Sequence, residues 1–452
     1  MPDLKRRDFL KLVGVSAGGA AAAGCSDHVE KLIPYVVQPE EITPGIAVYY
    51  ASTCQECNVG CGLHVRTREA RPVKLEGNPD HPINRGRLCA RGQAGIGRTF
   101  HPDRFRGPMA RGSEGTLEPI SWEDAQAQLV SRLESAGAKA RMLGSPTGPT
   151  LSAVLDGFND AVGLGPRVSF EPFAGDALRE AAKAVFGTEG QPLFDLSDSD
   201  YVVDFGSDLL DTGPSPVEHA RQLTAARDIT TDAGKKARLV YVGPRLDTTA
   251  ASSDAWLTPN PGSEGLLALG IAKVAFDARS RAGKPVGGDA GLIGGVLRRY
   301  TPDSVAKSTG VEAGTIERIG KELAAASRAV ALPPGVGLTS KSAVATNAAV
   351  LLLDAVLGAV GSRVDLAPVA AGSSYDDVRK LVKDMQGGGV SLLLVHGANP
   401  VYSLPASLGF GAALEKVGFV VSFASLPDET SDRADLILPE HTPLESWGDA
   451  AP

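Results

Sequence analysis

Cysteine is scarce in this chain and is confined to its N-terminal part. All five cysteines precede Ala90, so the long remainder holds no thiol for a disulfide or a metal centre. Cysteines spread through a chain favour disulfides, whereas a tight N-terminal group of them favours metal binding. An excess of positive charge is also missing: the net charge is −8, which argues against a general nucleic-acid-binding protein. The 43% of hydrophobic and 22% of charged residues are typical of a globular body, and 452 residues allow two or three domains.

The N-terminal apolar segment is too short to cross a bilayer. The run Leu12–Gly24 has 13 residues, fewer than the ~20 that a membrane-spanning helix needs. It follows the pair Arg6-Arg7, and a basic segment before a short apolar run predicts an export signal over residues 1–25. The paired arginines resemble a twin-arginine signal. We therefore expect an exported protein on the periplasmic face of the cytoplasmic membrane.

Cys25 ends the small-residue stretch of this signal and is a candidate lipidation site. The residues before it resemble a lipoprotein cleavage site, which would make Cys25 the acylated N-terminus of the mature protein. The alternative is plain cleavage after an alanine, with Cys25 unmodified. A proline-containing linker is expected over residues 26–44, ahead of the first domain.

The other four cysteines form a motif with metal-ligand spacing. Cys54, Cys57, Cys61 and Cys89 follow a C-x₂-C-x₃-C-x₂₇-C pattern, which places three thiols on one turn and brings the fourth from a distant loop. Four thiolates are the ligand set of a [4Fe–4S] cluster, one for each iron. Zinc accepts the same four thiolates. Two disulfides are a third possibility, although a Cys54–Cys57 bridge would be short and strained.

Residues around the cysteines resemble the cluster domain of a known family. The segments Gly60–Leu63, Glu76–Pro82 and Gly86–Gly92, together with His101–Pro108, are similar to the molybdopterin oxidoreductases, which include formate dehydrogenases and periplasmic nitrate reductases. This resemblance implies a [4Fe–4S] domain over residues 45–111. It also implies that Arg91, two residues after the last cysteine, bridges the cluster and a pterin.

The body of the chain alternates short apolar strands with alanine-rich helices, which is the pattern of parallel α/β layers. Strands are expected at Val202–Phe205, Leu239–Val242, Ala329–Leu332, Leu392–Val395 and Phe419–Ser422, and helices at Ala177–Phe186, Glu264–Phe276 and Thr346–Leu357. The resemblance implies an α/β fold in which the cluster domain is followed by two doubly wound, mostly parallel α/β domains, as in formate dehydrogenase and DMSO reductase. We expect one discontinuous domain over residues 112–150 and 329–452, with the other inserted at residues 151–328.

Two halves of the body look alike. The segments Val202–Asp208 and Leu393–Asn399 are each a strand ending in Gly-small-Asx, and each is followed by a second strand and an Asp before an apolar stretch. Such turns occur in any α/β protein, but their ordered recurrence indicates a repeated nucleotide-binding unit that receives its ligand at the carboxyl ends of the strands. The family resemblance implies contacts to a molybdopterin guanine dinucleotide from Gly206, Asp208, Arg245, Gly262, Gly397, Asn399, Glu429 and Asp435.

The sequence departs from the family where a molybdenum ligand is expected. The matching loop, Phe170–Asp176, has no Cys or Ser, and Asp176 is either a metal ligand or a helix N-cap. Gly243 stands where the family has an Asp. The sequence ends at Pro452, ahead of the family's C-terminal barrel, so we expect a fragment or a complex whose cluster-rich part is a separate polypeptide.

These departures resemble one branch of the family, the large iron–sulfur subunit of alternative complex III. The resemblance implies an electron-transfer and scaffold subunit without molybdenum, working with a quinol-oxidising integral membrane subunit and cytochrome c subunits. The alternative is a molybdopterin-dependent oxidoreductase that acts on a sulfur, arsenic or similar oxyanion.

Overall fold

The computed structural model describes residues 42–173, 175–230, 236–336, 340–366 and 372–450. The expected signal, Cys25 and most of the linker lie outside these residues. Residues 42–48 and 68–70 form a small compact unit of their own, in which Gly45 N donates to Glu69 Oε1 at 2.9 Å and Arg68 Nη1 donates to Gly45 O at 2.8 Å. The rest of the described chain forms the larger unit.

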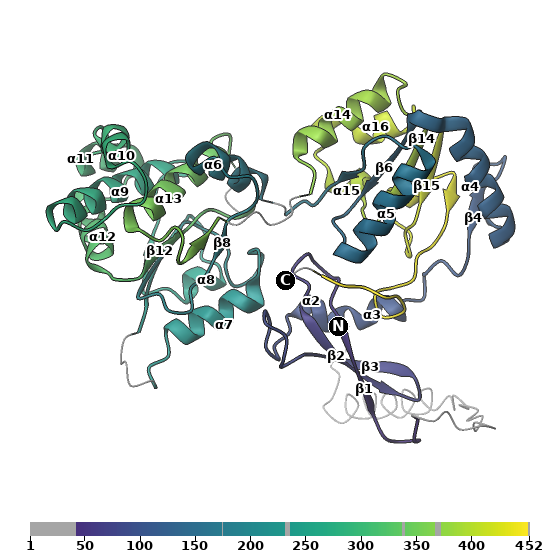
Figure 1. Ribbon diagram of the computed structural model, residues 1–452, viewed down its shortest axis with the longest axis horizontal. Helices are drawn as coiled ribbons and strands as arrows, with labels where there is room; N and C mark the ends of the chain where they lie inside the picture. Colours follow the sequence, from purple (N-terminus) through teal and green to yellow (C-terminus); the bar gives the residue numbers. More distant parts are fainter. Residues whose placement is uncertain (1–41, 174, 231–235, 337–339, 367–371, 451–452) are drawn as a thin grey trace, which may run out of the picture. The chain divides into compact units, whose positions relative to one another are not determined.

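The cysteine-containing domain is a three-stranded sheet followed by two short helices (Figure 1). Its elements are β1 (Val48–Thr53), β2 (Gly62–Arg68), β3 (Arg71–Gly77), α2 (Ala90–Ala94) and α3 (Ile96–Thr99). The strands lie in the order β1-β2-β3, and both helices pack against β3. This layout leaves the cysteines on the loops between the strands and on the loop that leads into α2.

The first α/β domain is built on a seven-stranded sheet in the order β5-β4-β16-β15-β14-β6-β7. Its strands are β4 (Met109–Arg111), β5 (Leu117–Pro119), β6 (Ala140–Gly144), β7 (Val168–Ser169), β14 (Leu392–His396), β15 (Phe419–Ser422) and β16 (Leu436–Ile437). The five strands from β7 to β16 are parallel, and β4 and β5 add an antiparallel edge.

Helices cover both faces of this sheet (Figure 1). Residues of α4 (Trp122–Ala136) and α5 (Pro149–Val162) pack against Leu392 and Leu394, whereas α14 (Tyr375–Gln386) and α16 (Phe410–Leu414) pack against Leu393 and Val395. Successive residues of a strand point to opposite faces, so a continuous apolar strand is buried on both sides. The sheet is therefore doubly wound, as expected.

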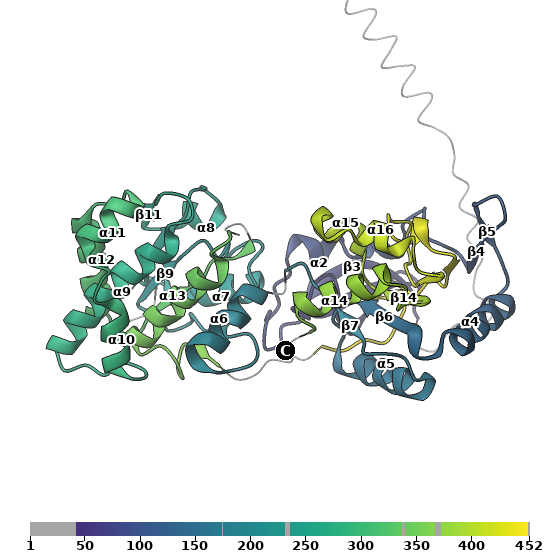
Figure 2. The same ribbon diagram turned by 90° about the horizontal axis from the view of Figure 1, so that it is seen from above.

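The inserted domain has a four-stranded parallel sheet in the order β11-β10-β9-β12 and a separate two-stranded ribbon. Its strands are β8 (Leu193–Phe194), β9 (Tyr201–Asp204), β10 (Arg238–Val242), β11 (Ala255–Leu257), β12 (Ala329–Leu332) and β13 (Val364–Asp365); its helices are α6 (Asp176–Phe186), α7 (Pro216–Ala226), α8 (Thr248–Ala251), α9 (Glu264–Arg281), α10 (Ala290–Leu297), α11 (Pro302–Thr309), α12 (Ala313–Ala325) and α13 (Ala343–Leu357). Helices α9 and α13 pack side by side (Figure 2). Each strand and helix expected from the sequence is present at nearly the expected bounds.

The boundaries of the inserted domain differ from those expected. Helix α5 packs on the seven-stranded sheet and β7 pairs with β6, so residues 151–169 belong to the first domain. Conversely, β12 pairs with β9 and α13 packs on α9, which places residues 329–366 in the inserted domain. The alternation of strands and helices carries no mark of where the chain crosses between two sheets of the same type, and this is why both boundaries were misplaced.

The internal repeat is visible in individual hydrogen bonds. Asp254 precedes β11, and it both donates from its N to Leu239 O and accepts from Leu239 N, each at 2.8 Å. Asp435 precedes β16 and does the same with Val420, at 2.8 and 2.7 Å. The register of the two sheets also matches, because β11 pairs with β10 as β16 pairs with β15. The two sheets are therefore copies of one structural unit.

The repeat extends to a pair of buried threonines. Thr249 Oγ1 accepts from Leu210 N at 3.2 Å, and Thr430 Oγ1 accepts from Val401 N at 3.1 Å. Both threonines are fully buried. Each one ties the segment after the second strand to the segment after the first, and so fixes the shape of the loops at the carboxyl edge of its sheet.

A carboxylate from far along the chain caps the start of α5. Gly148, at the N-cap position, has no side chain to offer, and Asp449 accepts instead from Thr150 N and, at 2.5 Å, from Thr150 Oγ1. The first backbone N–H groups of a helix lack partners within the helix, and a carboxylate there also opposes the positive end of the helix dipole.

Within the described ranges, no helix is both long enough and apolar enough to span a bilayer.

We predict that Asp254→Asn destabilises the inserted domain by about 1–3 kcal/mol, because Asp254 also pairs with Arg227 at 2.7 Å and Lys236 at 2.9 Å. Burial by itself would raise the pKa of Asp254, but the bonds from Arg227, Leu239 N and Lys236 hold it well below its ordinary value. This stabilisation is therefore present above pH ~4 and lost as the pH falls below it. Urea unfolding between pH 3 and 7 measures both effects. Asp198→Asn, at an exposed pair with Arg328, is the control and is expected to change stability little; an equal loss in both variants would contradict the prediction.

Candidate functional site

The loop of the first three cysteines is closed by its own backbone. Cys54 N donates to Cys61 O at 2.8 Å, which brings the first and third cysteines together. Both side chains are buried among Leu63, Val65 and Leu75, whereas Cys57 and Cys89 are half-buried. The described part of the chain therefore presents four free thiols in one small domain, with no disulfide among them.

Burial sets the protonation of these thiols. Burial, with smaller contributions from the neighbouring cysteines, raises the pKa of Cys54 to about 11 and that of Cys61 to about 12. At neutral pH both are thiols in the absence of a bound cation. Because metals bind the thiolate, binding must displace these protons, and the cation then supplies the opposing charge.

Asn84 holds the fourth cysteine's loop against the first three. Its Nδ2 donates to Gly62 O at 2.9 Å and to Arg87 O at 2.7 Å, and its Oδ1 accepts from Gly62 N at 3.0 Å. Gly62 follows Cys61, and Arg87 lies two residues before Cys89. The fully buried Asn84 amide therefore joins the two ends of the ligand set. We did not identify Asn84 from the sequence, although it lies within the segment that resembles the family.

No single-ion site is preformed in the described residues: no group of three or more His, Cys, Asp or Glu side chains is arranged to hold a metal ion. The four cysteines are included in this statement. The donor set itself fits a [4Fe–4S] cluster, which takes one thiolate per iron. Its assignment here rests on that donor set and on the family match given below, and not on a metal geometry already in place.

The crevice of the seven-stranded sheet lies between β6 and β14, where the strand order reverses. Gly397 follows β14 with φ 60°, and a Cβ there would lie 2.6 Å from Ser145 Oγ, so only glycine fits. Asn399 donates from Nδ2 to Glu429 Oε2 at 2.6 Å and accepts from Thr430 Oγ1 at 2.7 Å. The structure thus brings Gly397, Asn399 and Glu429 together at the edge where α/β sheets receive ligands, as expected.

The crevice of the four-stranded sheet has the same plan. Gly206 follows β9 with φ 78°, and its O accepts from Gly335 N at 3.0 Å across the switch between β9 and β12. Asp208 is buried and has φ 54°. Arg245 Nη2 lies 3.6 Å from Asp208 Oδ2 and 3.9 Å from Asp247 Oδ2. Gly206, Asp208 and Arg245 therefore meet at this second edge.

Carboxylates and a tyrosine dominate the second crevice. Burial raises the pKa of Asp204 to about 7, and its Oδ2 has no hydrogen-bond partner. The Tyr241 hydroxyl donates to Asp247 Oδ2 at 2.7 Å. A Cβ on Gly243 would lie 3.0 Å from the Tyr241 ring, so this ring lies where a side chain at position 243 would extend. The family's Asp at position 243 would therefore crowd Tyr241.

One of the expected cofactor contacts lies away from the crevices. Asp435 hydrogen-bonds the start of β15, at the amino edge of the sheet and opposite Gly397. Its expected role in binding is wrong in this structure, because its carboxylate holds two strands together. Arg91 is exposed on α2, two residues after Cys89. Gly262, with φ 83°, lies between β11 and α9, at the same edge as Gly206.

The loop before α6 offers no free metal ligand among its described residues. Helix α6 begins at Asp176, and its N-cap is Gly175, so the expected N-cap role of Asp176 is wrong. The Asp176 carboxylate instead pairs with Arg179, whose Nη1 also donates to Gly372 O at 3.1 Å. Glu171, earlier on the loop, accepts from Asn58 Nδ2 and from Phe173 N, each at 3.0 Å.

A histidine at the first crevice was not identified from the sequence. His396, the last residue of β14, pairs through Nε2 with Glu440 at 2.8 Å, and its buried Nδ1 has no partner. Its counterpart in the other sheet is the buried Phe205. A lone histidine at a strand end carries no sequence signal, and Glu440 lies 44 residues further along the chain.

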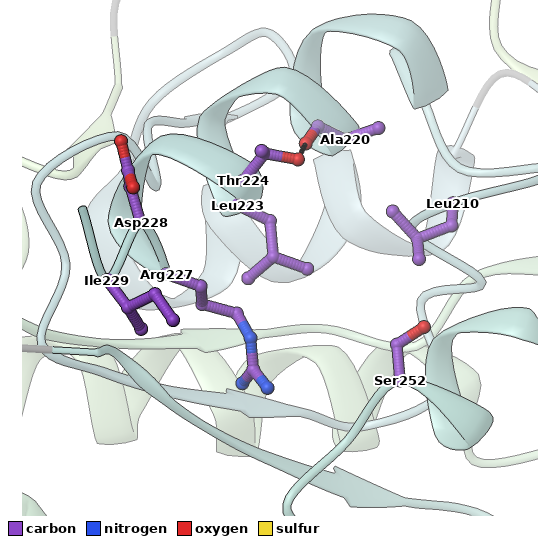
Figure 3. A pocket seen from close by; sticks show the side chains of 8 residues that line it. All are labelled: Leu210, Ala220, Leu223, Thr224, Arg227, Asp228, Ile229 and Ser252. Carbon is purple, nitrogen blue, oxygen red and sulfur yellow. Dashed lines mark hydrogen bonds between the residues drawn. The ribbon is translucent and has the colours of Figure 1, made fainter.

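A hollow with a volume of about 500 Å³ lies elsewhere, beside α7 of the inserted domain (Figure 3). Its apolar wall includes Leu210, Leu223 and Ile229. The polar groups of its rim are already engaged: Thr224 Oγ1 donates to Ala220 O at 2.6 Å, and Arg227 pairs with Asp254. It therefore presents no polar group that would orient a ligand.

Comparison with known families matches almost the whole described chain. The molybdopterin oxidoreductase Fe4S4 domain matches residues 48–101, and the molybdopterin oxidoreductase domain matches residues 104–448. These matches support a [4Fe–4S] cluster and a molybdopterin-type cofactor. Cys54, Cys57, Cys61 and Cys89 are the residues that would hold the cluster, and the glycine-lined crevices at Gly206 and Gly397 fit nucleotide binding.

Two of the relatives are subunits of reductases. The chain is 30% identical over 471 residues to the menaquinone reductase molybdopterin-binding-like subunit of Nitratidesulfovibrio vulgaris, covering 99% of this chain and 66% of the relative. It is 24% identical to the arsenate respiratory reductase molybdopterin-containing subunit of a Shewanella species, covering 99% of this chain and 62% of the relative. The chain thus spans just under two thirds of these relatives. The fold is also that of acetylene hydratase from Pelobacter acetylenicus, with a TM-score of 0.71, 17% identity, and 88% of this chain and 64% of that one covered.

We predict that Asn84→Ala strips the domain of most of its iron and acid-labile sulfide. The variant removes the buried partner of Gly62 N and of Arg87 O, each loss costing about 1–3 kcal/mol, and loosens the Cys89 loop, although Gly62 O keeps its bond from Asn78 N. Iron and sulfide analysis of the purified chain measures the effect. Asn159→Ala on α5, which removes a long bond to Leu164 O, is the control and is expected to retain its iron. Full iron content in Asn84→Ala would contradict the role given to this amide.

Proposed function

Because the chain belongs to the molybdopterin oxidoreductase family, we propose that it is an electron-transfer and scaffold subunit of a membrane-bound respiratory complex that works on quinol or quinone. In this proposal it carries out no molybdenum chemistry of its own. A bound [4Fe–4S] cluster supplies one-electron transfer. The protein contributes the cysteine loops that hold the cluster and the two α/β domains on which partner subunits assemble.

One observation supports the proposal that this chain performs no molybdenum catalysis. The single ligand candidate on the loop before α6, Asp176, is paired with Arg179, and Arg179 is held in turn by Gly372 O. A metal on Asp176 would compete with Arg179 for this carboxylate, and the largely buried arginine would lose its charged partner. Glu171 is likewise engaged by Asn58. The carboxylates of this loop therefore already have partners within the protein.

The comparisons support the respiratory setting. The relative with 30% identity is named as a subunit of a menaquinone reductase and as molybdopterin-binding-like. We propose a quinol-oxidising integral membrane subunit and cytochrome c subunits as the partners of this chain. Electrons from a two-electron quinol would pass singly through the cluster.

A second candidate function is supported by other relatives. The arsenate respiratory reductase subunit and the thiosulfate reductase subunit PhsA of Salmonella typhimurium are each 24% identical to the chain. In this reading the chain is the catalytic subunit of a molybdopterin-dependent reductase of an oxyanion, and Asp176 leaves Arg179 to reach the metal.

Metal analysis of the purified full-length protein distinguishes the two functions. We predict about four irons per chain and molybdenum or tungsten below roughly a tenth of stoichiometry, because Asp176 stays paired. The companion variant Asp176→Asn is expected to leave the metal content unchanged. Stoichiometric molybdenum that is lost in Asp176→Asn would establish the second function in place of the first.

We also propose that the protein is exported and held on the periplasmic face of the membrane by lipid on Cys25. We predict that the mature chain, produced without partner subunits, begins at an acylated Cys25 and sediments with membranes, since two or more acyl chains give stable attachment. Mass spectrometry of the N-terminus and fractionation of Cys25→Ala are the measurements. An unmodified N-terminus at another residue, or membrane attachment that persists in Cys25→Ala, would rule out the lipid anchor.

A further inference from the structure

Charge is distributed very unevenly along the chain. Residues 49–107 contain ten Lys and Arg against five Asp and Glu, a net charge of +5 in a chain whose total is −8. The remainder therefore carries −13. An acidic macromolecule approaching in solution is repelled by most of the chain and attracted to this one domain, which orients the encounter before any contact forms.

Three of these ten positive charges lie beside the fourth cysteine, two on its loop and one in α2. Arg85, Arg87 and Arg91 are all exposed, and they lie within four residues of the half-buried Cys89. Among the described residues their side chains take part in no ion pair, side-chain hydrogen bond or ring contact. The loop has a single acid, the exposed Asp80. We call the three arginines the Cys89 collar.

Three other arginines of this domain are engaged by the protein itself. Arg98 pairs with Glu56 at 2.8 Å and Arg104 pairs with Glu445 at 2.6 Å, while Arg71 lies over the Phe100 ring at 4.8 Å. Those side chains hold the fold together, whereas the collar contributes nothing visible to stability. The collar's charges are therefore available to a partner.

Backbone hydrogen bonds hold the loop that carries Arg85 and Arg87 in one conformation. Arg85 N donates to His81 O at 3.1 Å and Arg87 N to Asn84 O at 2.9 Å, and Asn84 fastens the loop to Gly62. Arg85 has φ 40° and Gly86 has φ 84°. The main chain therefore fixes the positions from which the Arg85 and Arg87 side chains extend, so a partner has to order those side chains but not the loop.

We propose that the Cys89 collar is the docking surface for an acidic electron-carrier protein that exchanges electrons at this domain. This inference rests on the proposed function in one respect, because only that function makes the partner an electron carrier. Cys89 and Cys57 are less buried than Cys54 and Cys61, so a carrier docked on the collar lies against the more exposed side of the cysteine set. Guanidinium groups pair with carboxylates in a bidentate fashion, so an acidic face on the partner matches the collar in chemistry as well as in sign.

The test uses the full-length protein and two small redox proteins of opposite charge, an acidic plant-type ferredoxin and a basic cytochrome c. Affinity is measured by biolayer interferometry over a range of salt concentrations. We expect ferredoxin to bind the wild type at low salt and to lose affinity as salt screens the charges, while cytochrome c binds weakly. The double variant Arg85→Glu with Arg87→Glu is expected to weaken ferredoxin binding by roughly tenfold or more and to flatten its salt dependence.

A control variant with the same charge reversal at another place distinguishes a specific docking surface from an effect of net charge. Arg298→Glu with Lys307→Glu places the same charge change on exposed positions of the inserted domain and is expected to change ferredoxin affinity less than twofold. Equal losses in the two double variants, or no loss in the first, overturn the proposal. Iron content and circular dichroism of each variant establish that it is folded.

Two further outcomes identify a wrong partner or a wrong function. Vesicles containing phosphatidylglycerol are tested with the same variants; if the collar reversal abolishes vesicle binding and leaves ferredoxin binding intact, the collar is a membrane surface and the proposal falls. Molybdenum in the purified protein would overturn the proposed function without altering the binding result. The two proposals can therefore fail independently.

Discussion

The Asn84 amide is the contact on which the cysteine site depends. Cys61 and Cys89 are separated by 27 residues, and backbone bonds from Asn78 N to Gly62 O and from Gly86 N to Asn78 O already bring the two segments together. Three hydrogen bonds from the buried Asn84 side chain to Gly62 and Arg87 complete the link, and burial makes each bond expensive to lose. Without this tie the first three thiols would remain a closed loop, because of the Cys54–Cys61 backbone bond, but the fourth would be held less firmly. The same tie holds the Cys89 collar in place.

The two α/β sheets show which parts of a repeated unit are constrained and which are free to change. The aspartates at 254 and 435 and the threonines at 249 and 430 make the same bonds in both copies, and these bonds hold the strands and loops of each unit. The residues at the crevices have diverged instead. Asn399 stands where the other copy has the buried Asp208. One scaffold therefore presents a neutral amide in one crevice and a carboxylate facing Arg245 in the other.

Much of this architecture follows from the sequence because its signals are local. Continuous apolar strands such as Leu392–His396 and helices such as α13 can be recognised from their length and composition. The spacing of the cysteines and the two Gly-small-Asx turns also predicted where the cysteine site and the two crevices lie. Side-chain partners could not be predicted in the same way. Asp176 was expected to be an N-cap or a metal ligand, but it pairs with Arg179 one turn along the helix. Asp435 was expected to bind cofactor, but it binds a strand, because position in sequence does not reveal which edge of a sheet a residue will reach.

The domain boundaries and the side-chain pairs between distant parts of the chain could not be predicted from the sequence, for a related reason. The chain leaves the seven-stranded sheet after β7 and returns to it at β14, and both sheets are built from the same kind of strand. His396 and Glu440, or Asp449 and Thr150, meet only because that return takes place.

This return has a consequence for biosynthesis. The inserted domain has all its strands and helices by residue 366, whereas β14, the central neighbour of β6, is not made until residues 392–396, and the carboxylate that caps α5 comes later still. As a chain emerges from the ribosome, the inserted domain can close first while β6 and β7 wait without their neighbours. Met142 and Leu143 of β6 are buried on opposite faces of the finished sheet, so the nascent chain leaves these apolar side chains uncovered for the time needed to translate more than two hundred codons.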